Sequence, residues 1–429
     1  MRKIINLIKK IVNNDYLFSV IAKVLGLGIA IIVSAMTARC FGAELKGVMS
    51  VVENDVTLYS VFIGLGIYQA YPFFRKKEPD ILPTYVNNIS SLFLLYEAVA
   101  VLIASVMIFC RINVFLAIAI MLMPVDAYIK QLNYIVLVEH PRRRNFSSLI
   151  ISMSEIVLLA VIWIFWNASV TSVLTYYICT VLANLALSYI NLRYNPLMVR
   201  FSLNRIFEFI KFGWIPMLVY LCMSINYKID IQMLKQYDHV SMADIGIYGT
   251  GVALASKIWL VPDAIKDILL SKLVKNGKGE CEVAKVIRIS LFVCTLCVLL
   301  LALLGKWAIL LLYGPEFDLA YYVMLIMLIG VEGMIFYKMV YSYNVSRGKR
   351  TINLIFLGLS AVVNVIGNLI LIPLYGIIGA AIMSVVSYLV CGICFLVYFH
   401  CVSQVPITQI LFPQKEDLDM LKGFFQKKK

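Results

Sequence analysis

Residues 17–71 read LFSVIAKVLGLGIAIIVSAMTARCFGAELKGVMSVVENDVTLYSVFIGLGIYQAY, two apolar runs joined by a short polar link. The first run, Leu17 to Ala38, contains a single charge, Lys23. At about 1.5 Å per residue, its roughly 22 residues are long enough to cross about 30 Å of hydrocarbon as a helix. The link, Arg39 to Gly47, contains two glycines and predicts a compact turn. This stretch therefore predicts a pair of membrane-spanning helices.

The rest of the chain has the same composition as this stretch. Of its 429 residues, 62% are hydrophobic and 14% are charged, and the mean hydropathy is +0.89. Soluble domains are about 45–50% apolar and about 25% charged. The apolar runs are about 20 residues long and do not alternate as barrel strands do, so we expect the spans to be helices. The composition therefore predicts an all-α polytopic membrane protein.

Windows of about 20 residues predict twelve spans. The distribution of basic residues supports this number, because 27 of the 38 Lys and Arg residues fall in alternate links and at both ends of the chain, and five fall in the other links. Basic residues favour the cytoplasmic side, so we expect both termini in the cytoplasm. This topology explains the net charge of +14 without a nucleic-acid partner. The predicted spans are residues 17–38, 48–71, 85–109, 112–136, 148–166, 170–192, 209–231, 244–270, 286–304, 320–343, 352–372 and 377–400.

A faint internal repeat predicts two halves. Gly47 opens the second span and Gly246 opens the eighth, each after a short polar link. Two parallel groups of six spans are a common transporter arrangement. We therefore predict an N-terminal six-helix bundle, a C-terminal six-helix bundle and a basic cytoplasmic tail that lies along the anionic inner leaflet. The predicted bounds of these three parts are residues 1–200, 201–402 and 403–429.

Fifteen charged side chains lie deep inside the predicted spans. Each costs a few kcal/mol to place in hydrocarbon, so such residues are functional candidates and indicate a hydrated interior. They are Lys23, Glu53, Asp55, Glu97, Asp126, Lys130, Glu155, Lys228, Asp230, Lys257, Asp263, Lys266, Asp267, Glu332 and Lys338.

Lys257 differs from the other charged residues because it lies near mid-depth of its span with no acid three or four residues away. We expect its ammonium group to contact a residue of another helix or an anionic ligand. Lys228 and Asp230 are two residues apart, so they do not face each other on a helix. Asp126 and Lys130 are four apart and are predicted to pair.

A local ion-pair cluster is predicted near the cytoplasmic end of the eighth span. Asp263 and Asp267 are one helical turn apart, and Lys266 is three residues after Asp263. Lys338 lies between the middle and the cytoplasmic end of the tenth span, where its ammonium group is expected to extend to the membrane surface.

Two pairs of cysteines have a spacing that metal ligands also use, Cys294-x-x-Cys297 and Cys391-x-x-Cys394. No histidines accompany them, and cysteine is a common small apolar residue at helix interfaces. We therefore expect these cysteines to fill interfaces, and we predict no metal site and no cofactor.

Four stretches together resemble the Wzx-type O-antigen and polysaccharide flippases of the multidrug/oligosaccharidyl-lipid/polysaccharide (MOP) exporter superfamily. The first is similar to the Arg-x-x-Gly-x-x-x-x-Gly link after the first helix of these flippases. The others are similar to the links before the eighth, tenth and twelfth helices. The resemblance covers essentially the whole chain. The stretches are Arg39–Gly47, Asp230 with Gly246-Ile247-Tyr248, Tyr313-Gly314-Pro315-Glu316-Phe317 followed by Ala320, and Asn364–Ala381.

The resemblance implies a MATE-like fold of two six-helix bundles around a positively charged central cavity. It implies a non-enzymatic flippase that moves undecaprenyl-pyrophosphate-linked oligosaccharides from the inner to the outer leaflet of the bacterial cytoplasmic (inner) membrane by alternating access. The product would serve O-antigen, capsule or exopolysaccharide assembly. The implied partners are the lipid-linked oligosaccharide, the lipid bilayer, a polysaccharide polymerase and a chain-length regulator.

The resemblance also gives roles to charged residues. Cations in the cavity would neutralise the pyrophosphate, and acids would balance these cations in the empty site or carry coupling protons or sodium ions. The expected cavity cations are Arg39, Lys228, Lys257 and Lys23. The expected acids are Glu53, Asp55 and Asp230.

Three other functions are consistent with a polytopic chain. An ion-coupled drug/cation antiporter of the same superfamily would carry a carboxylate in its first helix, where this chain has Lys23 and no acid. A peptidoglycan-precursor flippase would have about two more helices. An integral membrane glycan polymerase or transferase would show a large outer loop or an Arg/His/Asp constellation, whereas His140, His239 and His400 lie in or beside loops without such neighbours.

Overall fold

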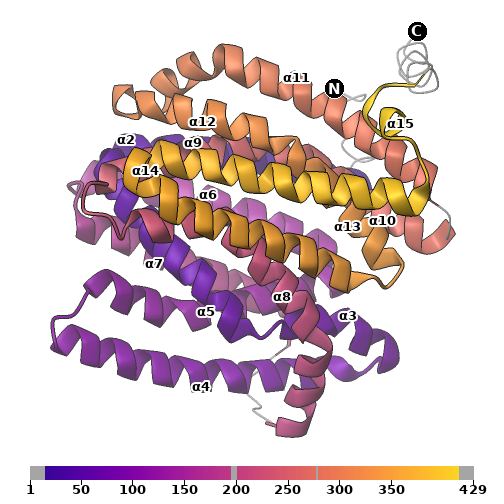
Figure 1. Ribbon diagram of the computed structural model, residues 1–429. Helices are drawn as coiled ribbons and strands as arrows, with labels where there is room; N and C mark the ends of the chain where they lie inside the picture. The colour runs from indigo at the N-terminus through magenta and orange to yellow at the C-terminus, as the bar shows by residue number, and fades with distance from the viewer. Residues whose placement is uncertain (1–14, 195–200, 277–278, 415–429) are drawn as a thin grey trace, which may run out of the picture. The chain divides into compact units, whose positions relative to one another are not determined.

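The computed structural model describes residues 15–194, 201–276 and 279–414, and this part of the chain consists of helices and short connections (Figure 1). The helices up to residue 192 are α2 (Asp15–Gly64), α3 (Ile67–Lys77), α4 (Ile81–Phe109), α5 (Val114–Glu139), α6 (Pro141–Phe165) and α7 (Val170–Leu192). Those after it are α8 (Leu203–Leu234), α9 (Met242–Ser256), η1 (Lys257–Trp259), α10 (Leu260–Asn276), α11 (Glu280–Leu312), η2 (Pro315–Phe317), α12 (Asp318–Val331), α13 (Gly333–Ser346), α14 (Arg350–Ser403) and α15 (Ile407–Leu411).

The number of spans agrees with the sequence. Within the described residues, nine helices are long and apolar enough to cross a membrane, and the pair α12 and α13, bent by 41°, qualifies as a tenth span. Two of the nine, α2 and α14, contain a glycine with non-helical backbone angles, Gly42 and Gly376, and each is two helices joined at that residue. Counted in this way, the described chain contains twelve spans, and the predicted all-α polytopic membrane fold is confirmed.

The hairpin in α14 turns at a single residue. Gly376 has φ 53° and ψ −129°, a conformation that glycine adopts without steric cost. Asn364 Nδ2 donates to Ser387 Oγ across the two arms at 3.2 Å, and a Cβ atom on Gly379 would collide with the backbone oxygen of Leu371. The two arms therefore lie antiparallel in direct contact (Figure 1).

The link in α2 is shorter than predicted. Lys46 Nζ donates to the backbone oxygen of Ser34 at 3.0 Å, whereas twelve residues of straight helix would separate them by about 18 Å. The chain therefore folds back at Gly42, the one residue here with non-helical angles (φ 74°). The prediction of a polar link over residues 39–47 was wrong in length, because helical hydrogen bonding continues on both sides of the glycine.

Substituting Gly379 is expected to destabilise the α14 hairpin. Gly379→Ala would place a methyl group against the Leu371 carbonyl and should lower the free energy of unfolding by about 1–3 kcal/mol, as overpacking does elsewhere. Gly358→Ala in the same element is the matched control, because its Cβ would lie 3.9 Å from Cys222 Sγ, an ordinary contact. Thermal unfolding of the purified variants measures both, and equal midpoints would contradict the tight packing described.

The second span is interrupted, although the sequence predicted it to be continuous over residues 48–71. Leu65 and Gly66 both have positive φ, 48° and 64°, so α2 ends at Gly64 and α3 begins at Ile67. The break lies against α8, where a Cβ on Gly66 would collide with the Gly213 backbone oxygen. At the break, the backbones of Gly66 and Gly213 are therefore in direct contact, with no side chain between them.

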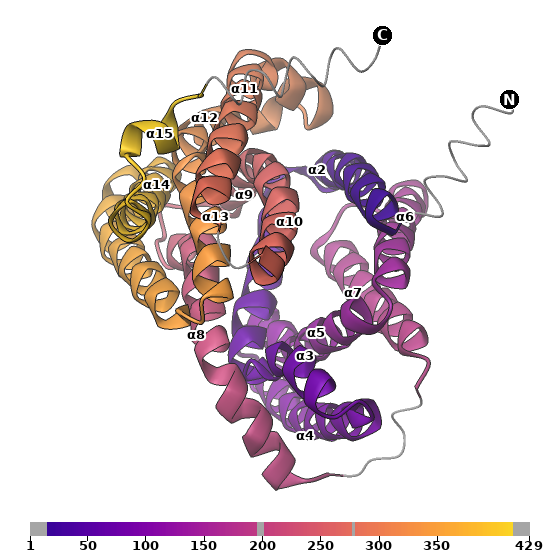
Figure 2. The ribbon, with the colours of Figure 1, turned by 90° about the vertical axis from the view of Figure 1, so that its right-hand side faces the viewer.

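The chain divides into two compact units. Unit 1 comprises residues up to 221 together with 241–246, and unit 2 comprises 222–240 and residues from 247 on. In unit 1, α2 packs on α5 and α6, and α5 also contacts α4 and α7 (Figure 2). In unit 2, α14 packs on α12 and α13, and α10 packs on α13. The predicted division at residues 200 and 201 stays a prediction.

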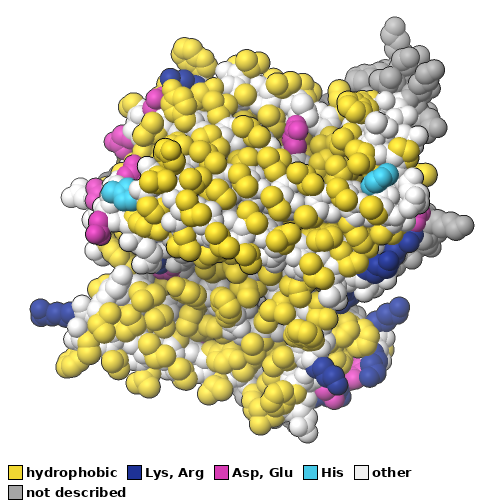
Figure 3. Space-filling model, viewed as in Figure 1, with side chains coloured by type: hydrophobic (Ala, Val, Ile, Leu, Met, Phe, Trp, Pro, Cys, Tyr) yellow, Lys and Arg dark blue, Asp and Glu magenta, His cyan; other side chains and the backbone are white. Residues whose placement is uncertain are grey.

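The outer surface of the described chain is suited to lipid. Large apolar side chains such as Phe109, Trp307 and Leu311 are 88%, 75% and 77% exposed. Figure 3 shows a nearly continuous hydrophobic surface over α12 and α14 in unit 2, with an acidic group inside it. With twelve spans, these exposed side chains indicate a multi-pass membrane protein.

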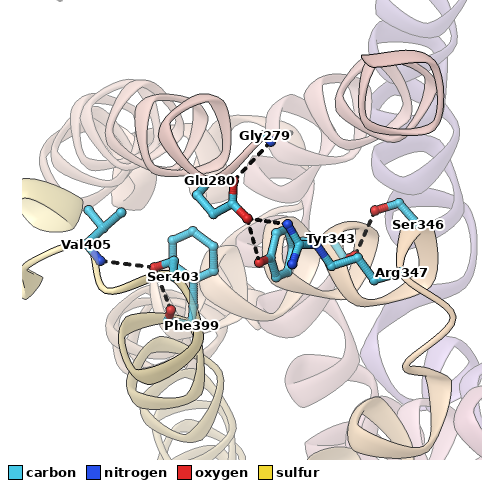
Figure 4. Close-up of polar contacts among 8 residues, drawn as sticks. All are labelled: Gly279, Glu280, Tyr343, Ser346, Arg347, Phe399, Ser403 and Val405. Atoms are coloured by element: carbon cyan, nitrogen blue, oxygen red, sulfur yellow. Dashed lines mark hydrogen bonds and ion pairs between the residues drawn. The ribbon is translucent and has the colours of Figure 1, made fainter. Parts of the chain in front are cut away.

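At the helix ends predicted to be cytoplasmic, two glutamates form ion pairs with arginines of neighbouring helices. Glu280, at the start of α11, accepts a hydrogen bond from Tyr343 at 3.2 Å and forms an ion pair with Arg347 (Figure 4). The Arg347 guanidinium also lies 4.4 Å from the centre of the Tyr343 ring. In unit 1, Glu139 pairs with Arg75 at 2.6 Å. These arginines, which the sequence analysis used only as topology signals, also tie neighbouring helices together.

The first part of the predicted tail packs on the protein. Ile410 of α15 is buried, and Arg288 of α11 donates to the backbone oxygen of Gln409 at 2.6 Å. Residues 415–429, which carry most of the predicted basic tail, lie outside the described residues.

Candidate functional site

The predicted cavity cations are distributed over both units. Arg39 is exposed in α2 of unit 1, whereas Lys228 in α8 and Lys257 in η1 are half-buried in unit 2. All three take part in interactions within the structure, so none is isolated. Lys23 belongs to α2, but its side chain is outside the described part of the chain. That these four cations face one cavity stays a prediction.

Lys257 lies at a break in the eighth span, just before Pro262, a residue type that permits a kink in a helix. The eighth span is helical to Ser256, passes through one 3₁₀ turn at η1 and resumes as α10. Pro262 has no N–H group to donate to the backbone oxygen of Ile258, which favours a break at this position. Such breaks in spanning helices are common at binding sites and hinges, so the proline was the sequence signal for this position.

Glu53 and Asp55 have different surroundings, and their shared role stays a prediction. They are two residues apart on α2, and Glu53 is exposed while Asp55 is 2% exposed. Glu53 lies close enough to Glu155 of α6 for the two negative charges to repel each other. The sequence analysis counted Glu155 among the acids within spans but did not place it beside Glu53, because sequence spacing carries no information about contacts between distant helices.

Asp230 is the centre of a buried polar cluster in unit 2. Its carboxyl group is 2% exposed and accepts hydrogen bonds from Asn368 Nδ2 at 2.6 Å, Tyr248 Oη at 2.6 Å and Ser384 Oγ at 2.5 Å. Both carboxyl oxygens are therefore bonded to neutral donors. Asp230, Tyr248, Asn364, Asn368 and Ser384 are called the Asp230 cluster below.

The cluster continues through the core of unit 2. Asn368 Nδ2 also donates to Asn364 Oδ1 at 2.9 Å, and Asn364 Nδ2 reaches Ser387 Oγ at 3.2 Å. Ser360 Oγ donates to Asn226 Oδ1 at 2.8 Å. All of these side chains are buried. A row of buried polar groups destabilises a membrane protein unless the groups form hydrogen bonds with one another or bind a ligand.

One acceptor of the cluster is not satisfied. Asn368 Oδ1 is buried and accepts no hydrogen bond from the described residues. An amide oxygen beside a carboxylate and a hydroxyl group is the oxygen-rich environment that hard cations select. The cluster therefore has the chemistry to hold a sodium ion or a proton. The described residues contain no group of three or more His, Cys, Asp or Glu side chains that would hold a metal ion.

The sequence analysis missed Asn364 and Asn368 as site residues. They are four residues apart in an apolar span, and the hairpin at Gly376 brings them against Ser384 and Ser387. The signal was a polar face within an apolar helix. It was overlooked because the search was for charged side chains.

Two ion pairs within spans were predicted, and both are present. Lys130 Nζ lies 2.7 Å from Asp126, and Ser60 Oγ, at 2.6 Å from Asp126, joins the pair to α2. Lys266 pairs with Asp263 at 3.5 Å. The side chain of Asp267, the third member of the predicted cluster, is not described.

The prediction for Lys338 was wrong. Its side chain is 8% exposed and pairs with Asp263 at 2.7 Å, so it does not extend to the membrane surface. Its ammonium group also lies 5.3 Å from the centre of the Trp259 ring. Two partners from η1 and α10 hold the group inside unit 2, where a cation–π contact and an ion pair offset the loss of water.

The structure is similar to solved transporters along almost its whole length. A chain described as the lipid II flippase MurJ in an inward closed conformation superposes with TM-score 0.69 at 16% identity, covering 96% of this chain and 92% of that one. This chain has a MATE-like fold.

A multidrug resistance MATE family transporter of the MOP superfamily supports the same assignment. Its inward-facing conformation superposes with TM-score 0.63 at 14% identity, covering 89% of this chain and 94% of that one. Its outward-facing conformation gives TM-score 0.61 at 14% identity, with 92% and 97% covered. No family model matches the sequence, and no curated protein matches it. The comparisons therefore identify the MATE-like fold and leave the substrate open.

Proposed function

We propose that this chain is a flippase that moves undecaprenyl-pyrophosphate-linked oligosaccharide repeat units to the outer leaflet of the bacterial inner membrane. The observation that carries this proposal is the fold match to a lipid II flippase over 96% of the chain. The four stretches that resemble polysaccharide flippases support it. The substrate of such a protein has a polyprenyl tail that stays in lipid and a charged headgroup that hydrocarbon excludes.

Cations in or beside the spanning segments suit that headgroup. Lys228 and Lys257 lie in spanning segments of unit 2, and Arg39 lies in α2 of unit 1. A diphosphate accepts charge-assisted hydrogen bonds from lysine and arginine, and these bonds strengthen where water is scarce. The proposed role of these three residues is to replace the water around the pyrophosphate.

We assign ion coupling to the Asp230 cluster. A fully buried carboxyl group with an unsatisfied amide oxygen beside it would bind a sodium ion or a proton. Uptake and release of that ion would change the charge inside unit 2 by one and so favour different arrangements of its helices. Glu53 and Asp55 in unit 1 are proposed to balance the cations of the empty site.

The alternative is an ion-coupled drug/cation antiporter, because multidrug MATE transporters share the fold. The run from Leu17 to Ala38 contains Lys23 and no acid, which does not favour a carboxylate-coupled exchange of cations there. A polymerase or transferase is the alternative from a different class.

Deleting the gene is expected to remove the surface polysaccharide and to trap lipid-linked repeat units on the cytoplasmic leaflet. The measurement is mass spectrometry of extracted undecaprenyl-linked glycans together with staining of the surface polymer, and a plasmid copy of the gene should restore both. The trapped glycan would name the substrate. An unchanged surface glycan with altered sensitivity to cationic drugs would instead indicate the antiporter, and unpolymerised single units at the surface would indicate the enzyme.

A further inference from the structure

A groove in unit 2 contains a carboxyl group near the middle of a helix pair that is long enough to span a membrane. Glu332 lies between α12 and α13, near the middle of the bent tenth span. The groove beside it has a volume of about 380 Å³ and is bounded by α11, α12, α13 and α14. Its other lining residues are mainly apolar and include Leu291, Ile329, Phe336, Leu389 and Ile393.

Two glycines that line the groove bring α13 and α14 into direct backbone contact. A Cβ on Gly392 of α14 would collide with the Gly333 backbone oxygen, and a Cβ on Gly333 of α13 would collide with the Tyr388 backbone oxygen. At this level the two helices have no side chains between them. The helix pair α12 and α13 bends by 41° directly before Gly333, so Glu332 lies at the bend and beside the groove.

The groove faces the lipid. Ile329 and Ile393, on its two sides, are 64% and 58% exposed, and Figure 3 shows the hydrophobic surface over the same helices. Thr295 donates to Glu332 Oε1 at 2.6 Å from an exposed position on α11. Among the ion pairs of the described residues, none includes Glu332.

A carboxylate in this position costs a few kcal/mol unless a positive charge accompanies it. An apolar groove with a single acid and one hydroxyl group is complementary to a ligand with an apolar body and a single positive charge. A volume of about 380 Å³ lies within the range of about 300–1,000 Å³ found for small-molecule sites.

We propose that the groove beside Glu332 binds lipophilic organic cations that enter from the bilayer. The aliphatic lining and the Phe336 ring contact the body of the ligand, and the Glu332 carboxylate contacts its charge. Thr295 holds the carboxylate in place from α11. This site is independent of the flippase proposal, whose substrate headgroup is an anion.

Binding of radiolabelled tetraphenylphosphonium to the full chain in lipid nanodiscs tests the proposal. Glu332→Gln, which keeps the side-chain shape, is expected to weaken binding at least about tenfold through loss of the charge pair. Glu97→Gln is the matched control, because Glu97 is a half-buried acid in span α4 of the other unit; binding should be unchanged. Equal binding by wild type and Glu332→Gln would overturn the proposal, as would equally tight binding of neutral triphenylphosphine oxide.

A second measurement does not depend on how well that variant folds. Dicyclohexylcarbodiimide reacts with carboxyl groups in hydrophobic surroundings, and mass spectrometry of the labelled peptide reports on Glu332 in the wild-type chain. Tetraphenylphosphonium is expected to reduce this labelling severalfold while leaving the Glu97 peptide unchanged. Ile393→Trp, which fills the groove from its lipid side, should reduce both binding and labelling. Labelling of Glu332 that the cation does not change would overturn the site.

Discussion

Cells in which Asp230→Asn replaces the wild-type residue are expected to lose surface polysaccharide by at least about tenfold, with normal amounts of the protein in the membrane. Asparagine has nearly the same shape as aspartate, but its neutral amide cannot take up a proton or neutralise a sodium ion. The hydroxyl groups of Tyr248 and Ser384, which donate to the carboxyl group, can rotate to accept from an amide instead. The fold should therefore persist while ion binding is lost.

The control for this experiment makes the same change at the surface. Asp318→Asn removes a carboxylate that is 43% exposed and 3.6 Å from Lys306, where an ion pair is worth little. It should leave surface polysaccharide unchanged. Quantitative staining of the polymer and immunoblotting of membranes measure both variants. A wild-type level of polymer in the Asp230→Asn strain would show that the Asp230 cluster serves only to stabilise unit 2.

Lys257→Ala is expected to abolish transport with normal protein levels. If this ammonium group replaces water around the pyrophosphate, its removal takes away one of the three proposed cations and weakens the interaction with the doubly charged headgroup inside the membrane by about 1.5–3 kcal/mol. Lys257→Arg keeps the charge and should retain part of the activity. The measurement is accumulation of trapped lipid-linked repeat units in the deletion strain that carries each variant.

Lys306→Ala is the matched control for Lys257→Ala. Lys306 is 44% exposed and pairs with Asp318 near the helix ends predicted to be extracytoplasmic, so its loss should change nothing measurable. Full surface polysaccharide in the Lys257→Ala strain would remove Lys257 from the site. A loss of activity in both strains would mean that transport responds to net charge and not to the break at η1.

The spans of this fold could be predicted from the sequence of each segment alone. The thickness of the hydrocarbon layer sets the length of an apolar span, and the Lys and Arg residues in the links indicate its orientation. A run such as Leu17 to Ala38 requires no knowledge of its neighbours to be recognised as a helix. The breaks within spans could not be predicted in the same way. Leu65 and Gly66 leave helical geometry because Gly213 lies against them, and sequence spacing alone does not reveal that contact.

The candidate site was predictable in part. Asp230 is costly in an apolar span and was selected for that reason, and the structure places it in a polar cluster. Its partner Asn368 was missed because the search considered only charged side chains, and an amide is neutral. Lys338 was misplaced because Asp263 is 75 residues away in sequence, and only the packing of α10 on α13 brings the two together.

The one-residue turn at Gly376 has a consequence for biosynthesis. The two arms of α14 leave the ribosome in immediate succession, and Asn364 of the first arm finds Ser387 of the second without any other helix. The Ser360 hydroxyl likewise bonds to the Ser387 backbone oxygen at 2.8 Å within the same pair. The insertion machinery therefore receives a hairpin that already shields part of its own polar face. The pairing of the two arms thus satisfies some of their polar groups before α14 packs on α8, which is made earlier.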